Sequence, residues 1–549
     1  MVALTPPDSY RGYVVAEDRS ELISAWSPLH QAVFRSLWLA AIVSNIGTWM
    51  QNVAGLWLMT SLTSSPVMVA LMQTATSLPV FLVVLPSAAL ADIIDRKRML
   101  LFTQGWMCVA AAGLSALTFM GTTTPWALLA FTFALGLGSA MNMPIWQAII
   151  PGLVRRSELP AAVALNSVAF NIARAVGPAL GGAVVAAAGP GPVFLLNAAS
   201  FIGVIAVVYR WENSAPKNSL PAEHMIAAIK TGARYTLHAP ALQAVLVRCL
   251  AFIVCSSSLW ALMPLMARHE LGLGSVGFGW LFGCIGTGAL LGAALLPRFR
   301  KAASTDQLVN AASVVLAVVI LLLALIRNIE ILYVAMVAAG IAWMTAMSNL
   351  TVSAQTSTPS WVQARALGFY TLAFQGGMAI SSVMWGAIAE RGGNSFSLSC
   401  ASIALMLGLV FSLKWRLGAI SDLDLRPSSH WPDPDLMVEP EPDEGPVYVA
   451  LEYRIDPSNA DKFVKAVHDL SRIRRRDGAV QWSLFRDLGD SGRYIEIFKV
   501  ESWAEHLRQH SRVTVSDRAA ERRVRAFHIG DKPPVVSHFI SQQNTSGIS

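Results

Sequence analysis

Arg174 is the residue of this sequence whose position most needs a chemical explanation. It lies about 15 residues into an apolar run, which at ~1.5 Å of rise per residue places it roughly 22 Å along a helix. A cation at that depth in an apolar phase costs at least about 2.5 kcal/mol. No Asp, Glu or His lies deep in any apolar run. Two interpretations therefore stay open: Arg174 binds an anionic ligand, or it is satisfied by backbone carbonyls and water.

Other polar and aromatic side chains recur at helical spacing within the apolar runs, so that they share single helix faces. Polar residues at such positions face a bundle interior or a wet cavity, although some serve only as hydrogen bonds between helices. Taken together, these faces predict a substrate cavity. Its candidate residues are Asn45, Trp49, Asn52, Asn142, Trp146, Asn171, Arg174, Asn349 and Gln375.

The elements that would carry these residues are long apolar runs, and a membrane-spanning helix needs about 20 such residues. The chain is 54% hydrophobic and only 14% charged, against about 25% charged in soluble proteins. We therefore predict an all-α membrane protein of twelve helices in two sets of six, with the lipid bilayer as a partner. The runs are 36–61, 66–90, 99–120, 125–150, 159–188, 191–209, 241–266, 275–297, 306–326, 330–356, 364–389 and 395–415.

The composition also divides the chain into segments, because the sixth and seventh runs are separated by a long polar stretch and the last run is followed by one rich in Pro, Asp and Glu. Such a stretch is typical of an extended linker. The predicted segments are an N-terminal tail (1–30), a first six-helix bundle (31–210), a central loop (211–240), a second bundle (241–418), a linker (419–445), a soluble domain (446–540) and a tail (541–549).

The distribution of Lys and Arg predicts the orientation. If the N-terminus is inside, the internal loops hold thirteen of these residues and the external loops three, which satisfies the positive-inside rule. Both ends of the membrane part, and the soluble domain with them, are thus expected in the cytoplasm at the inner membrane. The net charge of +7 is accounted for by these loops and does not indicate nucleic acid.

Two motifs carry a resemblance to a known family. The loop Ala88–Arg98 reads AALADIIDRKR, and the fifth run contains ARAVGPALGG at Ala173–Gly182. These resemble the signatures of the major facilitator superfamily and of its exporters. The resemblance implies alternating access, in which the loop Asp meets the start of the eleventh helix when the cytoplasmic side closes. The gating residues that it implies are Asp92, Arg96, Lys97, Gly177, Pro178, Gly181 and Gly182.

The form of both motifs is most similar to the transmembrane secretion effector branch, which includes enterobactin-exporter-like proteins. This implies export of a small siderophore-like or drug-like molecule, with uptake as the alternative direction. Thr132 and Leu135 stand where many proton-coupled exporters have Arg and Gln, so the resemblance does not extend to proton antiport. There is no phosphate-binding loop of the G-x-x-x-x-G-K-[ST] type, which argues against direct use of ATP.

The soluble domain shows a βαββαβ pattern, the order of a split βαβ ferredoxin-like fold. Around Glu501–His510 it resembles antibiotic-biosynthesis monooxygenases, which implies that two copies can pair through their sheets as a homodimer. An enzyme, a ligand-binding module and a dimerisation device are its open alternatives. His506 and His510 share a helix face, but two histidines make a weak metal site. We expect no cofactor, metal or disulfide, since the five cysteines lie in apolar runs without a CxxC pair, and we expect a transporter rather than an enzyme.

Overall fold

The structure is a computed structural model that describes residues 26–93, 95–211, 225–418, 424–428, 430–431, 438, 440–530 and 532–541. The side chains of residues 85–93, 148, 156 and 225–228 lie outside that description. Most of both predicted tails, residues 1–25 and 542–549, also lies outside it.

Six helices form the N-terminal half in the order that the apolar runs predict. Pro125, Pro160 and Pro190 occupy first turns of these helices, where a missing N–H costs no intrahelical hydrogen bond. Gly189, with a φ of 82°, makes the sharp connection between the fifth and sixth helices. The helices are α1 (Ala32–Leu62), α2 (Pro66–Ile93), α3 (Arg96–Phe119), α4 (Pro125–Leu153), α5 (Leu159–Ala188) and α6 (Pro190–Arg210).

The C-terminal half repeats this layout. Its first helix runs into a short π-helical segment, η3 (Met266–Glu270), and its last span is broken into two helices after Gly408. The helices are α8 (Pro240–Leu265), α9 (Ser275–Ala302), α10 (Thr305–Leu325), α11 (Ile329–Thr356), α12 (Gln363–Gly392), α13 (Asn394–Gly408) and α14 (Phe411–Lys414).

Within the described chain, eleven segments are helical, long and apolar enough to cross a membrane. Helix α1 is not among them, because Asn45, Gln51 and Asn52 make it more polar. It is nevertheless 31 residues long and packs against both α5 and α6. The predicted all-α membrane bundle of six plus six helices is thereby confirmed.

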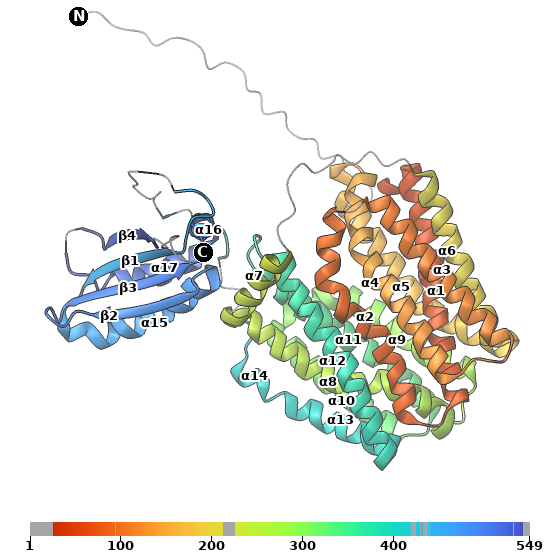
Figure 1. Cartoon of the computed structure of the whole chain (residues 1–549). Coiled ribbons are helices and arrows are strands. Elements are labelled where there is room, and N and C mark those ends of the chain that lie inside the picture. The colour runs from red at the N-terminus through yellow and green to blue at the C-terminus, as the bar shows by residue number, and fades with distance from the viewer. Residues whose placement is uncertain are drawn as a thin grey trace, which may run out of the picture.

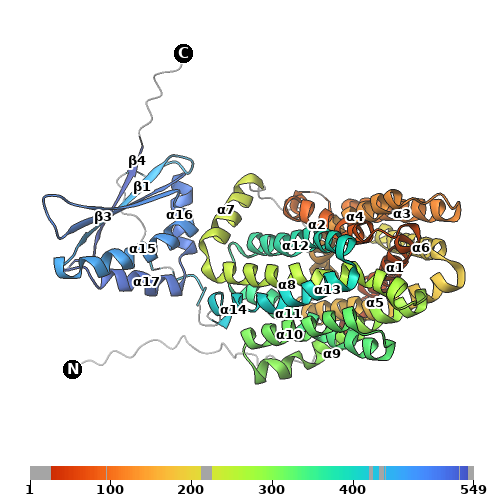
Figure 2. The same cartoon turned by 90° about the horizontal axis from the view of Figure 1, so that it is seen from below.

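The two halves lie side by side and meet along two helix pairs, α2 with α12 and α5 with α9 (Figure 1). Consecutive spans run in opposite directions, so α1, α5, α8 and α12 all begin at one end of the bundle. This is called here the α7 end, because α7 (Met225–His238) leads into α8 there, and the opposite end is called the distal end. Figures 1 and 2 show the soluble domain beside α7 in both views.

Helix α7 departs from the expected central loop at residues 211–240. It is too short and too polar to read as a span, but Tyr235 on it is only 2% exposed. Its Gly232 lies against Arg365 and Phe369 of α12. Packing of this kind, rather than intrinsic propensity, stabilises a 14-residue helix.

The soluble domain has one antiparallel sheet in the order β2-β3-β1-β4, the arrangement predicted for a split βαβ fold. The predicted second helix is divided in two, because Thr514 and Asp517 form a capping box that starts a new helix. Its elements are β1 (Val447–Arg454), α15 (Ala460–Asp477), β2 (Gln481–Arg486), β3 (Arg493–Val500), α16 (Trp503–Arg512), α17 (Val515–Arg525) and β4 (Val535–Ile540).

Part of the predicted linker belongs to this domain structurally. The His430 imidazole lies 2.7 Å from a carboxylate oxygen of Glu521, and the Trp431 indole N–H donates to the same carboxylate. Pro427 pairs with Thr514 in an isolated bridge. The described residues 427, 430 and 431 of the predicted linker therefore pack against the soluble domain.

Candidate functional site

Arg174 lies on α5, half-buried, where helices from both halves converge. Its guanidinium carbon is 5.8 Å from the ring centroid of Trp49 on α1 and 6.0 Å from that of Trp260 on α8. Both distances are within the range of a cation–π contact. Among the residues that the structure describes, no Asp or Glu forms an ion pair with Arg174, so its charge is held by aromatic faces alone.

The position of Trp49 follows from the glycines of α5. A Cβ at Gly177 would lie 2.6 Å from the Trp49 Cβ, and one at Gly181 would lie 2.8 Å from the Met50 Cα. Only glycine lets α5 approach α1 this closely. The close approach places the Trp49 ring beside Arg174, one turn earlier on α5.

Gly182 faces the other half of the molecule. A Cβ there would lie 2.5 Å from the carbonyl oxygen of Ser275 and 3.1 Å from the Gly279 Cα, both on α9. The Pro178 carbonyl lies against the same glycine of α9. The Gly-Pro motif thus joins α5 to α1 on one face and to the C-terminal half on the other.

An aromatic cluster continues from Arg174 into the C-terminal half. Trp260 packs edge-on against Trp343 at 5.2 Å, and Trp343 packs against Phe374 at 6.4 Å, next to the predicted site residue Gln375. The sequence analysis missed Trp260 and Trp343. A tryptophan in an apolar run carries no sequence signal that separates a binding residue from a packing residue.

Several predicted cavity residues form hydrogen bonds with other residues of the bundle. The Asn142 side-chain oxygen accepts hydrogen bonds from Thr103 and Gln104 on α3, at 3.2 and 3.3 Å. Asn349, 2% exposed, accepts one from Arg300 of α9 at 3.1 Å. The Asn171 amide donates to the Ser167 carbonyl of its own helix. Asn45, Asn52 and Gln375 are half-buried on α1 and α12.

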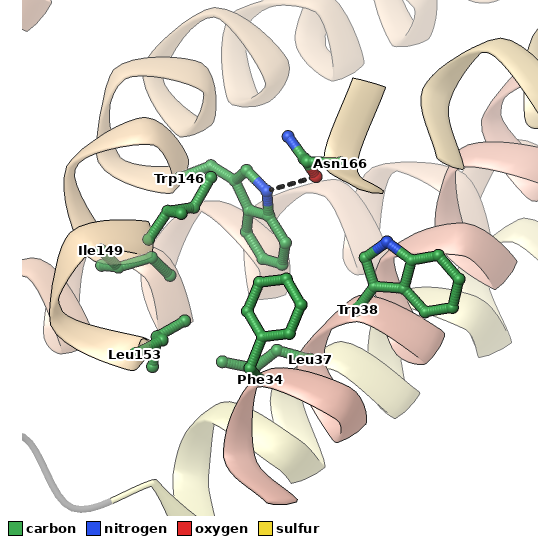
Figure 3. A pocket seen from close by; sticks show the side chains of 8 residues that line it. Phe34, Leu37, Trp38, Trp146, Ile149, Leu153 and Asn166 are labelled. Atoms are coloured by element: carbon green, nitrogen blue, oxygen red, sulfur yellow. Dashed lines mark hydrogen bonds between the residues drawn. The ribbon is translucent and has the colours of Figure 1, made fainter. Parts of the chain in front are cut away.

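Trp146 lines a small cleft at the α7 end between α1, α4 and α5 (Figure 3). Its indole N–H donates to the Asn166 side-chain oxygen at 3.3 Å, as the dashed line in the figure shows. Phe34 and Trp38 supply rings to the cleft, and its other lining residues are aliphatic. The residues that line this cleft include no charged side chain to pair with an ionic ligand.

The structure is closed at the distal end. Arg268 donates to the Thr60 hydroxyl at 3.3 Å, and the Ser65 hydroxyl donates to Glu390 at 3.1 Å, so both contacts tie the halves together. Along the face of α5 that carries Arg174, exposure increases toward the α7 end: Pro178 is buried, Arg174 is half-buried and Ser167 is exposed. Arg174 is therefore approached from the α7 end.

The residues of the α2–α3 connection lie at that end. Asp92 is in the last turn of α2, with its side chain outside the described set, and Arg96 begins α3. Lys97 donates to the carbonyls of Tyr209 and Trp211 at 2.9 and 2.5 Å, a favourable place for a cation because these carbonyls end α6. Asp95 caps α3 by accepting the Lys97 N–H.

Solved structures with the same architecture include a bacterial homologue of the human lysosomal transporter Spinster, at 13% identity and a TM-score of 0.53 over 72% of this chain and 96% of that one. A POT family transporter in complex with 5-aminolevulinic acid matches at 12% identity and a TM-score of 0.57, over 70% and 96%. With its two six-helix halves, the chain has the fold of these transporters and is a multi-pass membrane protein. Together with the family match that follows, this makes it a secondary transporter of the major facilitator superfamily.

The family model of transmembrane secretion effectors matches residues 23–546, and the chain belongs to that family. Among curated relatives, the enterobactin exporter EntS of Shigella flexneri is 25% identical over 394 residues, which is 70% of this chain and 93% of the relative. That of Escherichia coli O157:H7 is 24% identical over the same shares.

Proposed function

We propose that this protein exports a small organic anion, siderophore-like or drug-like, across the inner membrane by alternating access, with both chain ends in the cytoplasm. Arg174 carries the proposal, because its charge lies between two tryptophan rings at the meeting of the halves with no carboxylate among the described residues to neutralise it. A structural role would be met at lower cost by an uncharged side chain. The planar guanidinium suits two oxygens of an anion, and the neighbouring rings suit an organic body.

Export is favoured over uptake by the relatives, since the curated proteins similar to this chain are named enterobactin exporters. Exit of the substrate from the cytoplasm also fits a structure in which Arg174 is reached from the α7 end, if that end faces the cytoplasm as the loop charges predict. The bilayer and a small molecule are then the partners of the membrane part.

For the soluble domain we propose a homodimer contact through the outer face of its sheet. Phe485 and Phe539 on that face are 53% and 56% exposed, and Tyr448 lies beside Phe539 across the β1–β4 ladder. Exposed aromatic side chains on one sheet face favour pairing with a like surface.

The test of the transport proposal begins with a deletion strain compared with its parent, in which the exported metabolite accumulates inside the cells and falls in the medium. Export of that compound is then measured in variants of matched membrane abundance. Arg174→Gln should lower the rate about tenfold to hundredfold, as expected for the loss of a charged hydrogen bond worth about 1.5–3 kcal/mol. Arg174→Lys should keep part of the activity, because the charge survives without the planar geometry.

Arg35→Gln is the matched control, because Arg35 is an exposed arginine on α1 whose guanidinium donates to the Leu29 carbonyl. It should export at the rate of the parent. Full export by Arg174→Gln would reduce Arg174 to a packing residue and remove the argument for an anion.

A further inference from the structure

The soluble domain is docked on α7 through charged side chains. The Arg234 guanidinium donates to the Glu505 carboxylate at 2.8 Å, and these side chains are only 14% and 10% exposed. Lys230, one turn earlier on α7, contacts Glu501 at 2.5 Å in a more exposed pair. Because Glu505 is shielded from water, salt screens its attraction to Arg234 less than that of an exposed pair, and placing a second negative charge beside it is costly.

A second contact reaches the connection between α11 and α12. The Arg512 guanidinium of α16 lies 4.6 Å from the Trp361 ring centroid. Trp361 in turn packs edge-on against Tyr235 of α7 at 5.8 Å, and the Tyr235 hydroxyl donates to the Ser357 carbonyl at 2.9 Å. The domain, α7 and the start of α12 therefore form one packed unit.

Glu505 links the two contacts. It accepts from Arg234 on one side and from Arg512, at 2.6 Å, on the other. Arg512 also donates to the Asp477 carbonyl at 2.7 Å, which anchors it inside the domain. Removing Arg234 would leave Glu505 paired with Arg512, so a substitution on α7 can release the domain without unfolding it.

This unit lies where the bundle has to close. Helix α2 ends at Ile93 and α12 begins at Gln363, both at the α7 end, and these two helices pack together along the join between the halves. Closing the α7 end brings these helix ends toward each other. The docked domain holds the connection two residues before Gln363, on the C-terminal half, in a structure whose distal end is closed.

We propose that the docked soluble domain is an autoinhibitory brace, which keeps the α7 end open by holding α7 and the start of α12 until the domain is released. Coupling of this kind is typically worth a 5- to 150-fold change in an equilibrium. The inference concerns the conformational cycle and does not depend on what is carried or in which direction.

Docking is tested first, on the purified full chain. A zero-length carbodiimide reagent should join Lys230 to Glu501, detected by mass spectrometry as one linked peptide. Arg234→Glu places two carboxylates against each other and should lower the linked fraction at least about fivefold. Trp361→Ala should lower it as well. Arg298→Glu, the same charge change on an exposed residue of α9, should leave it unchanged.

Closure is tested by the labelling rate of a cysteine introduced as Ser167→Cys, on the exposed part of the Arg174 face. The chain without it gives the background from the five native cysteines. Labelling by a water-soluble maleimide should slow at least about fivefold when Arg234→Glu is added, and should stay fast with Arg298→Glu.

Three outcomes would overturn the proposal. Absence of the linked peptide in the unmodified chain, or its persistence in both Arg234→Glu and Trp361→Ala, removes the docking surface. Unchanged or faster labelling in an undocked variant removes the brace. None of these measurements requires the substrate, so their failure is separable from failure of the transport proposal.

Discussion

Two arginines within the bundle have different kinds of partner. One is held by a carboxylate and an amide, and the other by aromatic rings. Arg248 on α8, 4% exposed, is paired with Asp306 at 3.4 Å and with the Asn310 side chain at 2.5 Å. Asp306 also accepts the backbone N–H groups of Leu417 and Gly418. Arg248 therefore joins α8 to α10 and to the chain beyond α14. Among the described residues, Arg174 has the faces of Trp49 and Trp260 as its partners, and this difference is the reason for proposing a ligand there.

His506 gives a prediction of pH dependence at the scale of one residue. It is 1% exposed, and its ring lies 4.8 Å from that of His538 and 5.0 Å from that of His510. Burial, with the nearby His538 and His510, lowers the pKa of His506 to about 3. The folded domain keeps this imidazole neutral, whereas the unfolded chain takes up a proton as the pH falls below about 6.5. Its contribution to stability is therefore present above pH 6.5 and is lost as the pH falls toward 3.

Between pH 6.5 and 5 this loss should reach ~2 kcal/mol in the free energy of unfolding of the soluble domain, and His506→Gln should lack it. Hydrogen exchange of the domain, in the full chain and in its His506→Gln variant, measures this free energy of unfolding at each pH. The comparison with the variant is needed because burial raises the pKa of Asp477 to about 6, which stabilises the folded domain as the pH falls over the same range. Equal pH slopes in the two proteins would contradict the assignment to His506.

At the scale of elements, α5 carries Arg174 and packs against a helix of each half. Its small residues serve two neighbours at once, α1 through Gly177 and Gly181, and α9 through Gly182. The sequence motif predicts close packing, but it does not say which helix is approached. Two of these contacts lie within one half and the third lies between the halves.

Gly182→Ala should loosen the join between α5 and α9 near the distal end. The added Cβ would lie 2.5 Å from a backbone oxygen, and overpacking of this kind costs about 1–3 kcal/mol. The apparent melting temperature of the purified protein should therefore fall. Gly203→Ala is the matched control on α6, where a Cβ meets nothing within 4 Å and alanine favours a helix by up to ~1 kcal/mol. If the two variants melt alike, the close approach of α5 and α9 does not contribute to stability.

At the scale of the whole molecule, the halves are joined at the distal end and the soluble domain is docked at the other. The docking contacts described above lie on the C-terminal half, on α7 and the α11–α12 connection. In the proposed brace the domain acts on that half alone, by fixing the start of α12 against α7. Such a brace would need no part of the domain to enter the bundle.

The orientation of the chain is tested by reporter fusions. The excess of Lys and Arg in the loops at the α7 end predicts that this end is cytoplasmic. A phosphatase that works only outside the cytoplasm should be active when fused after Gly121, in the α3–α4 connection, and inactive after Ala303, between α9 and α10. Activity after Ala303 would reverse the orientation, and the direction proposed from it.

The sequence by itself determined the class of the molecule. Long apolar runs leave a helix in lipid as the only way to satisfy their backbone groups, so the number and order of the spans could be read from hydropathy. The βαββαβ pattern likewise predicted the order of the strands in the soluble domain. Arg174 could be singled out because a charge in an apolar run is rare and costly.

Only the tertiary structure decided which side chains meet. Helical spacing places residues on a face, but it does not give the rotation of that face toward a cavity, a neighbour or lipid. Asn142 and Trp146 therefore matched the predicted pattern and yet bond to adjacent helices. Trp260, which lies beside Arg174, and Trp343, which packs against Trp260, had no signal. Tyr235 of α7 bonds to Ser357, 122 residues further along the chain, and Glu505 docks on Arg234 across 271 residues. No local pattern records such contacts.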